Sequence, residues 1–428
     1  MKTALLFLLI CCTLGNASLA FGSEQVELRF SWWGGKSRNV ATLEALKAFE
    51  ARYPNIKVKA EYTGWDGYSS RVTTQLNSGT EADIIQTNWN WLTLLSRYGD
   101  GFYDLNNVSK EIGLEHYSPE SLATTTVNGK VNAIPISSNV MLFYYNAHTW
   151  EKAGVPLPTT WDELRAAGQQ FKAKLGDDYF PLVLSEQDVL LLVRSYMYQK
   201  YQKEMIDVKS KTFAWSHEEL VEGLTFYKSL MDAHVAPTMK QIASFGKGIN
   251  YEMKPWINGE WGGIYNWNVL YTPEAGNLMP PNKLVMGPYL MLPGAKDAGQ
   301  FRKTALMYSI SSHTKHPKEA ALLLNFLLNE KEGVVPVGLE RGAPLSKAGE
   351  KALRDAGIWQ DDDPVIQGLA QSAKLPNASA TLPQLEDGQF VTLFDNAREG
   401  IDYGKKNVDQ AATEFEQQVN RILKRIMR

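Results

Sequence analysis

A turn near the amino-terminal end of the chain combines residue types that bind polar ligands. Trp33, Gly34, Lys36, Ser37 and Arg38 end a stretch that begins at Leu28 as an apolar strand. Tryptophan rings offer flat faces for stacking, and cationic side chains hydrogen-bond to anionic groups. The turn carries no catalytic group, so its composition favours binding over catalysis.

Similar residues follow the later strands: Trp65, Tyr68, Asn88, Trp89, Trp267 and Asn268. Sugar rings have C–H faces that stack on aromatic planes, and polar side chains can bind their hydroxyls. For any single tryptophan, packing in the core explains the residue equally well. In a pair such as Trp32 and Trp33, one ring should face the core and the other a cleft, because strand neighbours point in opposite directions. Together these positions predict a sugar-binding cleft.

Three cations could bind a carboxylate in that cleft. Lys36 and Arg38 belong to the first turn, and Arg341 lies on a turn rich in glycine and proline. A guanidinium suits two-pronged recognition of a carboxylate. Taken alone, each of the three is more often a surface cation, so the acidic nature of the ligand is a hypothesis.

Other kinds of chemistry lack their signatures. The six histidines show no paired metal-ligand spacing, and the chain has no nucleophile elbow or phosphate-binding loop. We therefore expect no metal and no cofactor. Among the 47 acidic residues nothing singles out the carboxylate pair of a glycosidase, although inspection does not exclude one.

The elements that position the first turns alternate between strand and helix. Residues 56–62 alternate as a half-buried strand, 68–76 have helical spacing that ends at Gly79, and 82–86 form a short apolar strand. Repeated β-α-β units predict a mostly parallel sheet. Thr160 and Ser216 begin capping boxes, so 150–235 should be largely helical. We expect strands at 289–292 and 305–309, an irregular segment over 334–395, and a final helix to Ile426.

The first 22 residues have the features of a signal peptide. A lysine precedes an apolar run too short to span a membrane, and small residues at 18–20 predict cleavage between Ala20 and Gly22. Cys11 and Cys12, the only cysteines, lie in this leader, so the secreted chain should contain no disulfide. A formal net charge of −3 argues against nucleic acid as a partner.

Several motifs, in order along the chain, resemble one known family. They are Phe49 to Val58, Gly79 to Ile85, Asn128 to Pro135, Leu142 to Asn146, Trp150 to Val155, Pro158 to Leu164, Gly259 to Gly263 and Lys315 to Ala321. The chain is similar to the extracellular solute-binding proteins of family 1, the maltose-binding-protein-like sugar receptors of ABC importers. Within that family it most resembles receptors for oligogalacturonides. Glu260 and Trp261 replace small residues of the family pattern, which leaves the stacking ring of the second lobe open.

The resemblance implies the α/β periplasmic binding protein fold of type II, with two lobes, a hinge and a ligand cleft between the lobes. The first lobe should comprise residues 24–137 and 303–342, and the second residues 138–302 and 343–428. Mapped onto this chain, the family's cleft positions are Trp33, Gly34, Lys36, Ser37, Arg38, Trp65, Tyr68, Asn88, Trp89, Ser137, Ser138, Trp267, Asn268 and Arg341.

The implied function is non-catalytic. A periplasmic monomer would bind an oligosaccharide by hinge closure and deliver it to an inner-membrane ABC permease and its ATPase. The cationic side chains Lys36, Arg38 and Arg341 favour an acidic sugar, an oligogalacturonide from pectin. A neutral oligosaccharide such as a maltodextrin is the main alternative, and a secreted glycosidase or lyase is a further one.

Overall fold

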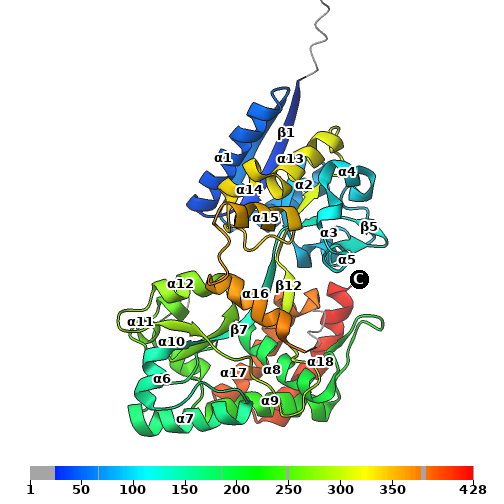
Figure 1. Cartoon of the computed structure of the whole chain (residues 1–428). Helices are drawn as coiled ribbons and strands as arrows, with labels where there is room; N and C mark the ends of the chain where they lie inside the picture. Colours follow the sequence, from blue (N-terminus) through cyan, green and yellow to red (C-terminus); the bar gives the residue numbers. More distant parts are fainter. Residues whose placement is uncertain (1–24, 66, 185, 247–249, 377–381, 428) are drawn as a thin grey trace, which may run out of the picture.

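The protein folds into two α/β lobes joined by strands. The computed structural model describes residues 25–427 except 66, 185, 247–249 and 377–381, so the predicted signal peptide lies outside the described residues. Figure 1 shows the first lobe above the second, with β7 (Ser138–Asn146) and β12 (Arg302–Thr304) running between them. The two lobes agree with the predicted two-lobed α/β fold.

The first lobe is built on a five-stranded sheet with the order β2-β1-β3-β13-β6. Strand β1 pairs in parallel with β2 and β3, as the β-α-β pattern predicts, whereas β13 pairs antiparallel with β3 and β6. The strands of this sheet are β1 (Val26–Trp33), β2 (Ile56–Thr63), β3 (Ile84–Asn88), β6 (Ile134–Pro135) and β13 (Leu306–Ile310). A separate hairpin joins β4 (Thr126–Val127) and β5 (Lys130–Val131).

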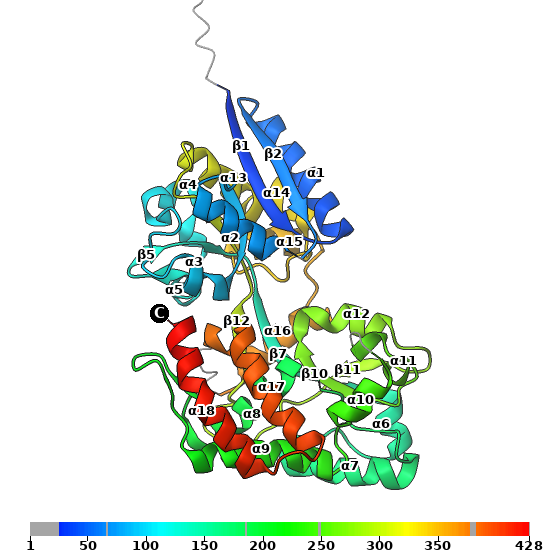
Figure 2. The ribbon, with the colours of Figure 1, turned by 180° about the vertical axis from the view of Figure 1, so that it is seen from behind.

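Helices cover both faces of this sheet, as the two opposite views show (Figures 1 and 2). On one face, Phe30 of β1 packs with Phe49 and Phe326 in a core that excludes water. Gly79 ends α2 in the left-handed conformation, at φ 65°, as predicted from its position. The helices are α1 (Lys36–Arg52), α2 (Tyr68–Ser78), α3 (Leu92–Leu95), α4 (Ser109–Ile112), α5 (Pro119–Ala123), α13 (Pro317–Asn329), α14 (Lys331–Val337) and α15 (Lys347–Asp355).

The second lobe forms around β7, whose apolar run from Val140 to Tyr145 is buried. Strands β10 (Gly263–Trp267) and β11 (Leu284–Met286) both pair antiparallel with it. The predicted capping boxes at Thr160 and Ser216 begin α7 (Trp161–Leu175) and α9 (His217–Asp232). The remaining elements are α6 (Ala147–Ala153), α8 (Glu186–Tyr201), β8 (Ile206–Asp207), β9 (Thr212–Phe213), α10 (Met239–Ser244), α11 (Lys254–Ile257), α12 (Tyr271–Gly276), α16 (Pro364–Lys374), α17 (Gly388–Asp402) and α18 (Val408–Ile426).

The chain crosses between the lobes three times. The first residues of β7 pair antiparallel with β12, so the two strands form a ribbon at the crossing. The third crossing comes later than predicted. Helix α15 packs on α13 and α14, and Trp359 packs beside Val334, so the chain belongs to the first lobe well past residue 342. It returns to the second lobe only at α16, which packs on β7.

Two local predictions are wrong. The segment 334–395 is not irregular, because it contains α15, α16 and the start of α17. Asp363 and Pro364, which suggest a chain break, instead cap and begin α16. Residues 289–292 do not form a named strand, and β11 lies five residues earlier. No helix in the described residues is long and apolar enough to cross a membrane.

Candidate functional site

Four aromatic rings gather where the parallel strands of the first lobe end. We call Trp33, Trp65, Tyr68 and Trp91 the aromatic rim. The ring centroid of Trp33 lies 5.2 Å from that of Trp65, 5.1 Å from that of Tyr68 and 5.4 Å from that of Trp91. A backbone bond from Gly34 to Thr63, 3.0 Å long, ties the loops after β1 and β2 together. The rim therefore forms where three neighbouring strands, β1, β2 and β3, end.

Only part of the rim faces solvent. Trp65 is 52% exposed and lies roughly parallel to Trp91, at 6.0 Å and 27°. Trp33 is nearly buried, and its neighbour Trp32 points to the other face of the sheet, where it stacks on Tyr62. The two rings therefore point to opposite faces of the sheet, as expected of neighbours on a strand. The exposed ring faces can stack on an apolar or sugar surface.

Tyr68, predicted as a cleft residue, keeps its hydroxyl inside the protein. It is fully buried, and its Oη lies 3.0 Å from the carbonyl oxygen of Ser31 and 3.1 Å from that of Gln86. Burial raises the pKa of the Tyr68 hydroxyl far above its ordinary value. Tyr68 therefore supports the rim from below and joins β1 to β3.

The amino-terminal end of α1 lies beside the rim and is strongly positive. Its N-cap, Gly35, has no side chain to satisfy the free N–H groups, and its first turn contains no acidic residue. Lys36 is exposed and Arg38 is half-buried in that same turn. Cations at the positive end of a helix dipole are unfavourable unless an anion is bound there. This end of α1 is thus suited to hold an anionic group.

Arg38 and Arg341 increase this positive charge without carboxylate partners. Arg38 donates to the carbonyl oxygen of Glu340, at 2.8 Å, whereas the carboxylate of Glu340 accepts from the Ser37 hydroxyl. Arg341 donates to Gln86 Oε1 at 2.9 Å and to Thr42 Oγ1 at 3.0 Å. In the described part of the chain neither guanidinium forms an ion pair. Burial and the nearby Arg341 lower the pKa of Arg38 to about 10.

Arg341 itself lies deeper than predicted. It is 3% exposed, and one of its terminal nitrogens has no hydrogen-bond partner among the described residues. Burial lowers its pKa, and its guanidinium lies 5.7 Å from the centre of the Tyr308 ring. Arg341 therefore does not face the cleft. It contributes charge from beneath the loop.

The remaining predicted residues divide between positioning and the space between the lobes. Asn268 is fully buried and accepts from the backbone N–H of Val140, so it does not reach a ligand. Asn88 accepts from the N–H of Trp89 and begins the turn η1 (Trp89–Trp91). Ser137 is buried, whereas Ser138 lines a large cavity.

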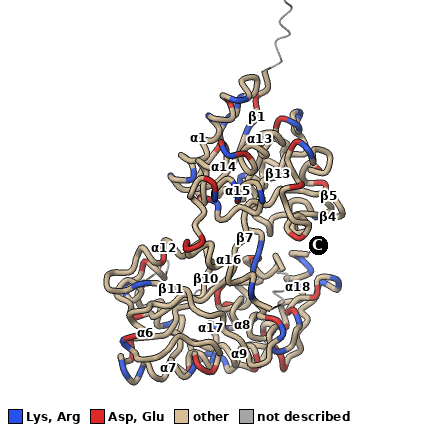
Figure 3. The backbone as a smooth tube through the Cα atoms, viewed as in Figure 1, with Lys and Arg blue, Asp and Glu red and all other residues tan. Residues whose placement is uncertain are grey.

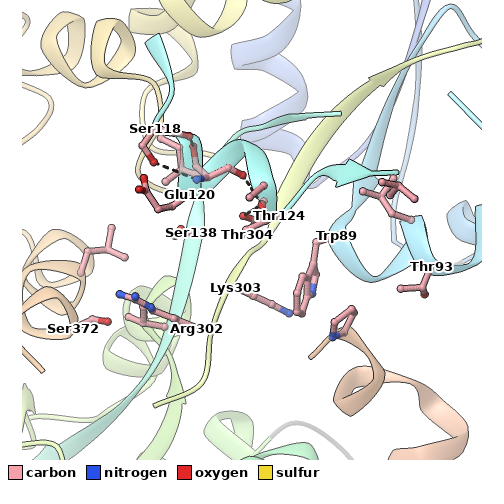
Figure 4. A pocket seen from close by; sticks show the side chains of 18 of the residues that line it. Trp89, Thr93, Ser118, Glu120, Thr124, Ser138, Arg302, Lys303, Thr304 and Ser372 are labelled. Atoms are coloured by element: carbon pink, nitrogen blue, oxygen red, sulfur yellow. Dashed lines mark hydrogen bonds between the residues drawn. The ribbon is translucent and has the colours of Figure 1, made fainter. Parts of the chain in front are cut away.

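That cavity, of about 1150 Å³, lies between the lobes along the β7–β12 ribbon (Figure 4). Trp89 and Ser138 are the predicted site residues that line it, and no ring of the aromatic rim does. Other lining residues include Thr124, Arg302, Lys303, Thr304, Trp359 and Ser372. Figure 3 shows the basic stretch on the ribbon between the lobes. The rim and the cavity are therefore separate surfaces that approach each other at Trp89.

A buried ion pair stands at this junction, and sequence reasoning missed it. Lys303 pairs with Glu386, whose second carboxylate oxygen accepts from the Trp89 indole N–H at 2.6 Å. The ammonium of Lys303 lies 4.3 Å from the centre of the Trp267 ring. We call Trp89, Trp267, Lys303 and Glu386 the junction cluster. Trp91 was also missed as a site residue, although its place after β3 is the same signal that points to Trp89.

Comparisons with known proteins identify relatives over nearly the whole chain. The family model described as "Bacterial extracellular solute-binding protein" matches residues 35–334. A solved periplasmic oligogalacturonide-binding protein from Yersinia enterocolitica, in complex with saturated digalacturonic acid, is 55% identical. That match has a TM-score of 0.87 and covers 94% of this chain and 100% of that one. A periplasmic solute-binding protein from Pectobacterium atrosepticum is 43% identical, with a TM-score of 0.90 and the same coverage.

A more distant sequence and a designed structure are also similar to this chain. A putative binding protein from Brucella abortus is 25% identical over 89% of each chain. A structure described as a de novo designed cysteine esterase is 54% identical, with a TM-score of 0.89, and covers 95% of this chain and 100% of that chain. The two cysteines of the present chain, Cys11 and Cys12, lie outside the described residues.

Proposed function

The chain belongs to the bacterial extracellular solute-binding proteins, and we propose that it binds an acidic oligosaccharide, an oligogalacturonide, without altering it. Its sugar would stack on the aromatic rim and place a carboxylate at the amino-terminal end of α1. The lobes would close over the ligand by movement at the β7–β12 ribbon and at the crossing before α16. The receptor would then pass the sugar to an ABC permease and its ATPase.

One observation carries this proposal. Lys36 and Arg38 stand on the uncapped, positive end of α1, directly after the rim residue Trp33, and Arg38 donates to the backbone carbonyl oxygens of Trp33 and Glu340. A ring face next to unpaired cations matches a sugar that carries a carboxylate. A neutral sugar would use the ring and leave the positive charge unsatisfied. The Yersinia relative, described in complex with saturated digalacturonic acid, supports this choice.

The proposal also includes a cellular location and an oligomeric state. With the leader removed, we expect the receptor to act in the periplasm as a monomer. Gel filtration of the secreted chain, with and without sugar, should give one monomer-sized species. A shift to a larger species would contradict the monomeric state and leave the sugar specificity unaffected.

Single substitutions of the rim residue Trp65 and of Lys36 on α1 test the proposed site. Trp65→Ala should weaken binding of trigalacturonate about tenfold, because it removes the most exposed stacking ring. Lys36→Ala should weaken it about threefold to fivefold, since an exposed charge contributes up to ~1 kcal/mol. Isothermal titration calorimetry measures both affinities.

Each substitution has a matched control in the same lobe. Tyr98→Ala removes an aromatic ring that is 65% exposed but lies outside the rim. Lys47→Ala removes an exposed lysine from the same helix, α1. If Trp65→Ala and Lys36→Ala bind the sugar as tightly as these controls, the site is elsewhere. Chromatography of the sugar after long incubation tests catalysis, and shortened chains would show that the protein is an enzyme.

A further inference from the structure

The junction cluster connects three parts of the molecule through one carboxylate. Glu386 belongs to the turn η6 (Pro383–Glu386) of the second lobe, Lys303 to the hinge strand β12, and Trp89 to the first lobe. One oxygen of Glu386 pairs with Lys303 and the other accepts from Trp89. Figure 4 shows the Lys303 side chain extending toward the Trp89 ring. Glu386 therefore ties the first lobe and the hinge to the second lobe.

This ion pair is shielded from water on both sides. The side chains of Lys303 and Glu386 are 10% and 7% exposed. Burial lowers the pKa of Lys303, and the charge of Glu386 opposes that shift. An ammonium in this position is costly without an anion beside it. Whatever replaces Glu386 must therefore also carry negative charge.

The cluster is within reach of a ligand. Lys303 and Trp89 both line the cavity between the lobes, and Trp89 begins the turn that ends at the rim residue Trp91. The Trp267 ring beneath Lys303 belongs to the second lobe and packs on Phe301. A sugar acid entering from the rim would thus meet a ring, a cation and an indole N–H. Glu386 now satisfies the cation and the indole N–H.

We propose that Lys303 is a specificity-determining residue that binds a carboxylate of the ligand, and that Glu386 is the resident carboxylate that the ligand displaces. The exchange replaces one anion by another, so the buried ammonium stays compensated. A neutral sugar cannot make this exchange and leaves Glu386 in place. The inference rests on the proposed function, because it assumes an acidic sugar.

The exchange also affects the contact between the lobes. When Glu386 leaves Lys303, its bond to the Trp89 indole is lost too, since the same carboxylate makes both contacts. Binding of an acidic ligand would then release one link between the lobes while the ligand itself forms new ones. A differential interaction of this kind is what couples a ligand to a conformational change.

The test compares digalacturonate with its dimethyl ester, which keeps the size of the sugar and removes its charge. The full secreted chain is titrated by calorimetry as wild type, Lys303→Met, Glu386→Gln and the control Lys59→Met. Lys59 is an exposed strand lysine on β2, far from the cluster in sequence, and its loss changes the net charge equally. The measured quantity is the ratio of acid to ester affinity.

Wild type and Lys59→Met should prefer the acid to the same degree. In Lys303→Met that preference should fall by about tenfold, because the cation for the carboxylate is gone. Glu386→Gln should bind the acid more tightly and the ester unchanged, since the internal competitor is gone. A merely structural role for Lys303 would weaken both ligands equally.

Two results would overturn the inference. One is an unchanged acid-to-ester ratio in Lys303→Met, and the other is weaker binding of the acid by Glu386→Gln. Circular dichroism checks the fold of each variant, and Glu386→Gln decides the matter if Lys303→Met does not fold. If wild type binds neither ligand, the proposed function fails, which is a different result from failure of the exchange.

Discussion

Two groups of cations lie near the junction of the lobes, and they differ in their partners. Lys36, Arg38 and Arg341 surround the amino-terminal end of α1, where in the described residues they make no ion pair. Lys303 is somewhat less buried than Arg341, with a side chain 10% exposed, and has the carboxylate of Glu386 beside it. The first group is a positive charge that a ligand can neutralise directly. The second already has a resident carboxylate, which an acidic ligand would have to displace.

The contrast also separates two costs of losing a cation. Removing Lys303 takes away the cation that pairs with a buried carboxylate, whereas removing Arg341 takes away a donor to two neutral oxygens. Buried ion pairs are known to contribute little net stability but to cost several kcal/mol when one partner is removed. Stability measurements can therefore test whether the two groups differ as described.

The largest effect is expected for Lys303→Met. The free energy of unfolding should fall by about 3 kcal/mol, because Glu386 keeps its buried position and loses its cation. Urea denaturation followed by circular dichroism measures this change. Lys59→Met serves as control and should change stability by less than about 0.5 kcal/mol. Equal stabilities of the two variants would show that the Lys303 pair is solvated.

A smaller effect is expected for Arg341→Met. Its partners Gln86 and Thr42 are neutral, so the loss should be about 1 kcal/mol of unfolding free energy. The same urea titration, run beside Lys303→Met, provides the measurement. A loss as large as that of Lys303→Met would break the comparison, since it would indicate an anionic partner for Arg341 as well.

Salt should weaken the attraction between the cations at the end of α1 and the ligand. Lys36 is exposed and Arg38 half-buried, so their attraction for a ligand carboxylate is screened by ions. Affinity for trigalacturonate should therefore fall between 50 mM and 500 mM sodium chloride, and Lys36→Ala should reduce the slope of that fall. Calorimetry across the salt series measures it. An affinity that is independent of salt would mean that Lys36 and Arg38 do not contact the ligand.

The smallest effect concerns a surface pair far from the ligand. His217 of α9 lies 3.0 Å from Asp409 and 2.9 Å from Glu416, both on α18, and bonds to these carboxylates raise its pKa to about 9. Because the folded-state pKa exceeds the unfolded value of about 6.5, protonated His217 stabilises the fold below pH 6.5. This contribution is lost as the pH rises from 6.5 through about 9.

Wild type and His217→Gln, compared by urea denaturation across this range, should differ most at the acidic end. At pH 9 and above their stabilities should converge. A difference that stays constant from pH 6 to pH 10 would show that the ring contributes by packing and not by charge.

The sequence predicted the strand ends well because their signal is local. Alternating strands, capping boxes and the left-handed glycine at 79 each depend on a few neighbouring residues, and the structure has them as expected. The rim followed from the rule that the carboxyl ends of parallel strands meet at one edge. Trp33 and Trp65 are far apart in the chain, yet this rule brought them together.

The misses have a common cause, which is that they depend on contacts between distant segments. Asn268 and Arg341 have residue types that suit a ligand, but the fold uses them to bind backbone and neutral side chains. The pairing of Lys303 with Glu386 joins positions 83 residues apart in the chain, and no local pattern marks it. Asp363 and Pro364 signal a break and a helix start equally well, so 334–395 was predicted as irregular.

Calorimetric titration of the wild-type protein with trigalacturonate and with its methyl ester tests the central claim most directly. The two sugars have nearly the same size and ring faces, and they differ mainly in the charge that Lys36 and Arg38 would recognise. We predict tight binding of the acid and at least about tenfold weaker binding of the ester. Equal affinities would contradict the account, since they would mean that stacking alone selects the sugar.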